Sequence, residues 1–102
     1  MGIVLKLDYD IKFEEFDVNG LRDKVDFVRM QTGLKATRVN IAMSRHGNTH
    51  VKIFYPDELP DLAMVALQAI YGSDWKRELH NLTRVLCGQR NWNILFEEIV
   101  KP

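Results

Sequence analysis

The feature that most limits the fold is a pair of alternating segments joined by a short turn. Residues 37–44 and 49–55 each carry an apolar side chain at every second position, and Arg45-His46-Gly47-Asn48 connects them. A period of two is typical of half-buried strands, and glycine and asparagine favour a tight turn. The pattern therefore predicts a β-hairpin. The residues expected to face the core are Val39, Ile41, Met43, Val51, Ile53 and Tyr55.

Other segments complete a regular order of elements. Residues 3–10 alternate in the same way and predict a first strand, with Tyr9 toward the core, whereas residues 92–100 predict a last strand whose inward face the sequence leaves open. Apolar residues at helical spacing predict a helix that begins near Asp17 or Asn19 and ends at Gly33. Two further helices are predicted on either side of Gly72. The first follows Pro60 and carries an apolar stripe of Leu62, Val65, Ala66, Ala69 and Ile70. The second is capped by Ser73 or Asp74, and its expected core face is Trp75, Leu79, Leu82, Val85 and Leu86.

This order predicts one α+β domain over residues 1–102. Strand, helix, strand, strand, helix, helix, strand (βαββααβ) is a ferredoxin-like split βαβ arrangement, in which a four-stranded antiparallel sheet carries its helices on one face. In that arrangement the first and third strands are neighbours, so their outward side chains share the open face of the sheet.

The composition of the chain excludes a strong overall electrostatic field and indicates the cellular compartment. Fourteen basic and fourteen acidic residues give a formal net charge of zero, so contact with nucleic acid has to be local. The one cysteine, Cys87, falls in an apolar helical pattern and is expected to be a buried, reduced core residue. We expect a cytoplasmic protein, in the host cell if the chain is viral, with no export signal and no membrane partner.

Polar residues on two strands form a candidate site. Asp8 and Asp10 lie two apart on the first strand, a spacing that can hold Mg²⁺ or Mn²⁺ through carboxylate oxygens. His50 and Lys52 share the outward parity of the third strand and are expected to lie beside these aspartates. The hairpin residues Ser44 and Arg45 add a hydroxyl and a cation, which suit phosphate or nucleotide binding.

These motifs resemble the first two motifs of the archaeo-eukaryotic primase superfamily. The matching segments are Leu7-Asp8-Tyr9-Asp10 and Ser44-Arg45-His46-Gly47-Asn48-Thr49-His50-Val51. The resemblance implies that Asp8 and Asp10 bind the catalytic metal and that His50, supported by Ser44, holds nucleotide phosphate. It also implies a third acidic residue on a later strand, for which Glu97 and Glu98 are candidates.

Most of the remaining chain is similar to short proteins of archaeal and bacterial viruses and plasmids, notably at Leu67-Gln68, residues 72–78 and Leu95-Phe96-Glu97. The resemblance implies a replication-associated protein of a mobile element. Primase-polymerases of the superfamily have a second subdomain, and 102 residues hold only the RNA-recognition-like half. We therefore expect a nucleic-acid-associated or nucleotide-binding protein without full polymerase activity. If it is an enzyme, its reaction is a metal-dependent nucleotidyl or phosphoryl transfer.

Two other functions fit the sequence. An RNA-recognition module has the same topology, but Asn48, Thr49 and His50 stand where its stacking aromatics belong. A homodimeric protein-interaction module without catalytic activity needs only an apolar surface, and Phe54 on the outward face of the third strand supplies one. A homodimer or another protein partner is the alternative to a nucleic-acid or nucleotide partner.

Overall fold

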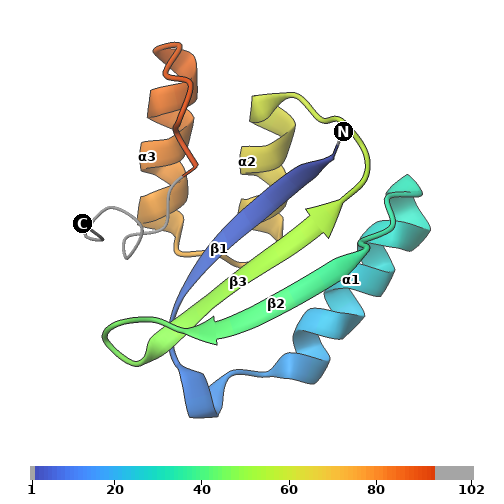
Figure 1. The fold of residues 1–102 in the computed structure, drawn as a ribbon, viewed down its shortest axis with the longest axis vertical. Helices are drawn as coiled ribbons and strands as arrows, with labels where there is room; N and C mark the ends of the chain where they lie inside the picture. The colour runs from blue at the N-terminus through green and yellow to red at the C-terminus, as the bar shows by residue number, and fades with distance from the viewer. Residues whose placement is uncertain (1, 94–102) are drawn as a thin grey trace.

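The structure is a computed structural model that describes residues 2–93, and it has the α+β character predicted from the sequence (Figure 1). The elements are β1 (Ile3–Lys12), the 3-10 helix η1 (Phe13–Glu15), α1 (Val18–Thr32), β2 (Arg38–Met43), β3 (Asn48–Tyr55), α2 (Asp61–Ile70) and α3 (Trp75–Leu86). Within residues 2–93 no helix combines the length and the apolar character needed to cross a bilayer. The predicted hairpin and the three predicted helices are confirmed.

The three strands form one antiparallel sheet in the order β1-β3-β2. The central strand β3 pairs Val51 with Leu7 of β1 on one side and with Ile41 of β2 on the other. A bulge shifts the register of β1 between Tyr9 and Lys12. Because the bulge adds residues to β1 only, β1 loses its regular register with β3 just beyond Tyr9.

The core lies between one face of the sheet and the helices α1 and α2, which Figure 1 shows behind the strands. Alternation puts every second residue of β1 and β3 on this face, where burial of apolar surface contributes about 25 cal/mol per Å². The fully buried apolar residues of the two strands are Leu5, Leu7, Val51 and Ile53. The opposite face of the sheet is left without a covering helix among residues 2–93.

A cluster of tyrosines joins the core to the turn after α2. The Tyr9 hydroxyl donates to the Tyr71 carbonyl oxygen at 2.7 Å, and the hydroxyls of Tyr55 and Tyr71 are 2.5 Å apart. Burial raises the pKa of all three tyrosines above the ordinary value, because it penalises the charged phenolate. The cluster therefore fixes the α2–α3 turn against β1 with neutral hydroxyl groups.

The ends of α1 follow the residues that the sequence indicated. The Asp17 carboxylate accepts a hydrogen bond from the Gly20 N–H at 2.9 Å, which satisfies one free donor of the first turn. Gly33 ends the helix at φ 79°, a left-handed conformation in which a side chain is strained. Both predicted boundaries of α1 are thus confirmed.

The predicted four-stranded sheet is wrong: the described chain forms three strands. Trp92 and Asn93, the first residues of the predicted last strand, belong to no strand, and residues 94–100 lie outside the described part. Instead of a fourth strand, side chains bond the outer edge of β1. Gln68 accepts from the Lys6 N–H at 2.9 Å, and Ser73 accepts from the Asp8 N–H at 2.9 Å. The main-chain groups that a neighbouring strand would use therefore already have partners.

The helix α3 packs with a mixed face inward: Leu82 and Val85 lie against the core as expected, but the fully buried residues are polar. Trp75 is 68% exposed, and Leu79 and Leu86 are exposed as well, whereas Glu78 and Asn81 are buried. Figure 1 shows α3 beside the β1 edge rather than behind the sheet. Its inward neighbours are thus main-chain groups, which need polar partners. Cys87, which follows α3, is exposed, so its predicted core position is also wrong.

Candidate functional site

The open face of the sheet carries its side chains in three rows that cross β1, β3 and β2. Register fixes each row, because residues directly opposite in a sheet point to the same side. The rows are Val4, Phe54 and Arg38; Lys6, Lys52 and Asn40; and Asp8, His50 and Ala42. The predicted neighbours Asp8, His50 and Lys52 therefore do share one face. Lys6 lies on the same face, because it is two residues from Asp8 on β1.

Asp8 and His50 form a direct pair in the row of this face that lies nearest the hairpin turn. The His50 Nε2 lies 3.1 Å from the Asp8 Oδ1, a distance at which the imidazole N–H donates to the carboxylate. The His50 side chain is only 6% exposed, while that of Asp8 is 28% exposed. The carboxylate therefore orients a buried imidazole and keeps an oxygen accessible to solvent.

Asp10 is separated from this pair by the bulge. Its carboxylate accepts from the Asn48 side-chain amide at 3.3 Å, at the exposed end of the sheet. The register of β1 shifts just there, between Tyr9 and Lys12. Asp8 and Asp10 alternate in sequence as predicted, but each has its own partner on β3.

The hairpin residues close the turn rather than reach toward His50. The Ser44 hydroxyl accepts from the Asn48 N–H at 3.0 Å, and the Gly47 N–H donates to the Ser44 carbonyl at 3.1 Å. Gly47 has a φ of 85°, which the turn requires and which favours glycine. Arg45 is exposed at the tip of the hairpin. Ser44 and Arg45 thus lie at one end of the open face.

The predicted metal site is not assembled by the described side chains. Within residues 2–93, no three His, Cys, Asp or Glu side chains lie close enough together to hold a metal ion. The candidates for a third acidic ligand, Glu97 and Glu98, lie outside the described residues. Binding of Mg²⁺ or Mn²⁺ at Asp8 and Asp10 stays a prediction.

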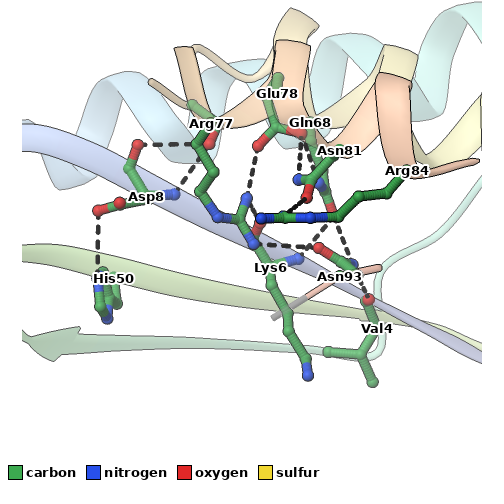
Figure 2. Close-up of polar contacts among 11 residues, drawn as sticks. Val4, Lys6, Asp8, His50, Gln68, Arg77, Glu78, Asn81, Arg84 and Asn93 are labelled. Carbon is green, nitrogen blue, oxygen red and sulfur yellow. Dashed lines mark hydrogen bonds and ion pairs between the residues drawn. The ribbon is translucent and has the colours of Figure 1, made fainter. Parts of the chain in front are cut away.

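A buried polar network at the β1 edge was missed by the sequence analysis (Figure 2). The Glu78 carboxylate accepts from the Gln68 amide at 2.8 Å, from the Asn81 amide at 3.0 Å and from Arg77 at 2.6 Å. Gln68, Glu78 and Asn81 are all buried. Each acceptor oxygen of Glu78 therefore has a donor, as a buried carboxylate requires.

This network reaches β1 through main-chain bonds. Arg77 donates to the Lys6 carbonyl oxygen at 2.7 Å, and Asn93 donates to the Val4 carbonyl oxygen at 3.4 Å and to the Gln68 side-chain oxygen at 2.8 Å. Figure 2 shows Arg77 and Asn93 meeting beside Lys6, with Arg84 extending toward Asn81. The side chains thus replace a neighbouring strand along this edge.

The network and the open face meet at Asp8. The Asp8 carbonyl oxygen accepts from the Asp74 N–H at 2.5 Å, and its N–H donates to Ser73. Its side chain, in contrast, points to His50 on the open face, as Figure 2 shows. The main chain of this residue is therefore held by the start of α3, which fixes where its carboxylate lies.

The remaining row pairs a cation with an aromatic ring. The Arg38 guanidinium carbon lies 4.4 Å from the centroid of the Phe54 ring, within the range of a cation–π contact. Phe54 is half-buried and Arg38 is exposed. The Phe54 ring, which was predicted to be an apolar dimer surface, is therefore partly covered by the Arg38 guanidinium of β2.

A pocket of about 560 Å³ opens next to the cationic row. It is bounded by β1, by the start of α2 and by residues 90–93. Its wall is mixed: Lys6, Asp61 and Arg90 bring charges of both signs, and Val4, Met64 and Trp92 are apolar. Lys6 thus borders both this pocket and the open face.

Comparison with protein-family models, with curated proteins and with solved structures found no match for this chain. The resemblance to the primase superfamily therefore stays a prediction from the two motifs.

Proposed function

We propose that this is a small nucleic-acid-associated or nucleotide-binding protein that holds phosphate on the open face of its sheet. The observation that carries the proposal is the cross-strand row in which Lys6 stands opposite Lys52, directly beside the Asp8–His50 pair. Opposite positions on neighbouring strands bring side chains within about 5 Å, so two ammonium groups concentrate positive charge on a chain whose net charge is zero.

The chemistry of this row suits a phosphodiester. Lysine ammonium groups bind phosphate oxygens as point charges, and the Asn40 amide in the same row adds a neutral hydrogen-bond donor. His50 is hydrogen-bonded to Asp8 and is only 6% exposed, so it helps to position the Asp8 carboxylate and leaves the phosphate contacts to the lysines and Asn40. These groups recognise the backbone rather than a base, and they give no sequence preference of their own.

The neighbouring row supplies a surface for a base. A planar base stacks on an aromatic ring or on a guanidinium, and such contacts contribute about 1–3 kcal/mol per base. Arg38 and Phe54 offer both groups one row away from the lysines. A single strand with unstacked bases fits this arrangement better than a duplex does, because duplex bases are not free to stack.

The decisive experiment measures binding of labelled single-stranded RNA and DNA by fluorescence anisotropy at several salt concentrations. Three cations, Lys6, Lys52 and Arg38, predict a slope of log K against log salt of about −2 for a single strand. The double variant Lys6→Gln/Lys52→Gln should weaken binding roughly tenfold and flatten the slope. Lys35→Gln is the matched control, because Lys35 is exposed and outside the sheet.

Two results would overturn the proposal. One is the absence of saturable binding to either nucleic acid or to a nucleotide at low salt. The other is equal loss of affinity in Lys35→Gln and in the double variant, which would indicate only a general charge effect. Addition of Mn²⁺ with a nucleotide tests the metal prediction separately: a rise in melting temperature that Asp8→Ala/Asp10→Ala removes would support it.

A homodimeric interaction module is the second candidate function. The observation that favours it is the outer edge of β2, whose residues Val39 and Met43 are apolar and exposed. This surface lies at the opposite side of the sheet from the α3 network, and binding there leaves the lysine row accessible. The two functions therefore do not exclude each other.

A further inference from the structure

The outer edge of β2 has main-chain groups that point away from the sheet. Ser44 and Asn48 form a hydrogen-bonded pair at the start of the hairpin, with Ser44 N–H donating to the Asn48 carbonyl at 2.8 Å. Antiparallel pairs alternate between bonded and non-bonded, so Ala42 and Asn40 also bond to β3. Val39, Ile41 and Met43 therefore direct their N–H and C=O groups outward, where the described chain has no further strand.

Two of these residues, Val39 and Met43, also expose apolar side chains, whereas Ile41 is partly buried against the core. Val39 is 37% and Met43 is 56% exposed, although both lie on the core face of the sheet. A groove of about 200 Å³ runs between this strand and α1. It is lined by Val18, Leu21, Arg22, Val25, Val39 and Ile41. The helix thus leaves the outermost strand of the core face incompletely covered.

Nothing in the sequence of β2 protects this edge. Proteins usually block an exposed edge with proline, with charged side chains or with a bulge. The strand Arg38–Met43 has no proline, its register with β3 is regular, and its only charge is Arg38 at the first position. Such an edge is a template for another strand.

We propose that the occupant of this edge is the β2 strand of a second copy of the chain, paired antiparallel about a two-fold axis. Because the outward groups belong to residues 39, 41 and 43, a bonded register places Ile41 opposite Ile41 and Val39 opposite Met43 of the second copy. The outward N–H and C=O groups of all three residues then have partners. The residues that face each other across the contact, Ile41 with Ile41 and Val39 with Met43, are apolar.

Two features favour a second copy over a longer chain of copies or an unrelated segment. The interface uses the same patch twice and is self-complementary, as a two-fold contact requires. The other edge of the sheet is closed by Gln68, Ser73 and Arg77, so pairing stops at two copies. A net charge of zero leaves no overall repulsion between the copies.

The inference deepens the second candidate function by naming the strand and the register, and it does not depend on nucleic-acid binding. An axis perpendicular to the sheet turns the open faces of both copies to the same side. The two lysine rows then belong to one continuous sheet surface, across which a single strand of nucleic acid could run. The dimer contact itself involves neither Lys6 nor Lys52, so failure of nucleic-acid binding leaves this inference standing.

The test measures mass in solution against protein concentration by sedimentation equilibrium. The wild-type chain should approach twice its 11.9 kDa mass as concentration rises. Ile41→Pro removes an outward N–H and no bond to β3, and Met43→Lys places a charge on the exposed edge. Both variants should stay monomeric. Leu62→Lys is the matched control, because Leu62 is 51% exposed on α2 and should remain dimeric.

Amide hydrogen exchange gives an independent readout in the wild type. The amides of Val39, Ile41 and Met43 should become protected as the dimer forms, whereas a monomer leaves them open to solvent. A wild-type chain that stays monomeric at its solubility limit would overturn the inference. So would dimers of Met43→Lys as tight as those of the wild type, since the contact would then lie elsewhere. Met43→Lys decides the matter if Ile41→Pro does not fold.

Discussion

The outward main-chain groups of the two outer strands, β1 and β2, differ in whether they have hydrogen-bond partners. Along β1, side chains that lie 62 to 89 residues away in sequence bond the main-chain groups that face outward. Along β2, the outward main-chain groups have no neighbouring strand within residues 2–93, and the side chains beside them are apolar. The edge of a sheet is therefore closed when its main-chain groups have hydrogen-bond partners, and apolar side chains beside it do not close it. One sheet can be closed at one edge and open to pairing with another strand at the other.

The largest expected effect is the loss of stability of the shared core at high pH. Above about pH 10, the ordinary tyrosine pKa, unfolded chains lose the phenolic protons, while the folded chain retains them because burial raises the pKa of Tyr9, Tyr55 and Tyr71. The folded state then binds more protons than the unfolded state, so the free energy of unfolding falls as pH rises. Below about pH 10 this contribution is fully present.

Tyrosinate absorbance and far-ultraviolet circular dichroism, followed together up to about pH 12, check this prediction. The chain has three tyrosines, and all of them are in the cluster. We expect tyrosinate to form only as helix signal is lost. Full tyrosinate absorbance near the ordinary pKa with unchanged helix signal would show that the cluster is not buried in solution.

The second effect breaks the closed edge at its centre. Glu78→Ala removes the acceptor for Gln68, Asn81 and Arg77 and leaves a guanidinium buried without its carboxylate. Loss of one partner of a buried pair costs about 3–5 kcal/mol, so the urea midpoint should fall sharply.

The control for this variant is Glu14→Ala, because Glu14 is exposed in η1 and its loss should change stability by less than about 0.5 kcal/mol. Glu78→Gln should be intermediate, since it retains the shape and one oxygen acceptor. Equal urea midpoints for Glu78→Ala and Glu14→Ala would show that the β1 edge does not depend on the network, and the two edges would then not differ in this way.

A third, smaller effect opens one bond of the closed edge. Ser73→Ala leaves the Asp8 N–H without its hydroxyl acceptor, at a cost of about 1–2 kcal/mol. Hydrogen exchange should accelerate at the Asp8 amide and much less at the Leu7 amide, which faces β3. Thr83→Ala is the control, because its hydroxyl bonds within α3 and not to β1. Unchanged exchange at Asp8 would contradict the role of Ser73.

The smallest effect concerns the stability of a single copy at the open edge. Met43→Lys should change the free energy of unfolding by less than about 0.5 kcal/mol when measured at high dilution, because the side chain is exposed and the ladder to β3 is kept. At high concentration the wild type should be more stable than this variant. A loss above about 1 kcal/mol at high dilution would mean that Met43 supports the monomer's own core.

Periodicity predicted the parts of the fold in which side chains alternate or repeat. The hairpin, the caps of α1 and the facing of Asp8 and His50 follow from local residue order and from strand parity. The bulge after Tyr9 has no comparable signal, because Asp10 and Ile11 continue the alternation of β1. Asp10 was therefore expected beside Asp8 and His50, and it bonds to Asn48 instead.

The inward polar face of α3 could not be found from amphipathic pattern alone. The predicted apolar stripe ordinarily faces the core, yet only two of its residues pack there. Leu82 and Val85 lie against the core, whereas Trp75, Leu79 and Leu86 are exposed. The opposite face lies against main-chain groups of β1, and this requirement is visible only once the strand edge is placed. Glu78 and Asn81 were the available signal, since they lie one turn apart on the same face and both can bond a buried edge.

The closed edge also sets an order for the making of this protein. A ribosome completes β1 before α2 and α3, and the side chains that bond its outer edge come from Gln68, Ser73, Arg77 and finally Asn93. Until those residues leave the exit tunnel, the nascent chain carries two unfinished edges instead of one. Of the three described strands, β1 is therefore synthesised first, but its outer edge stays open to premature pairing with neighbouring nascent chains until Asn93 has emerged.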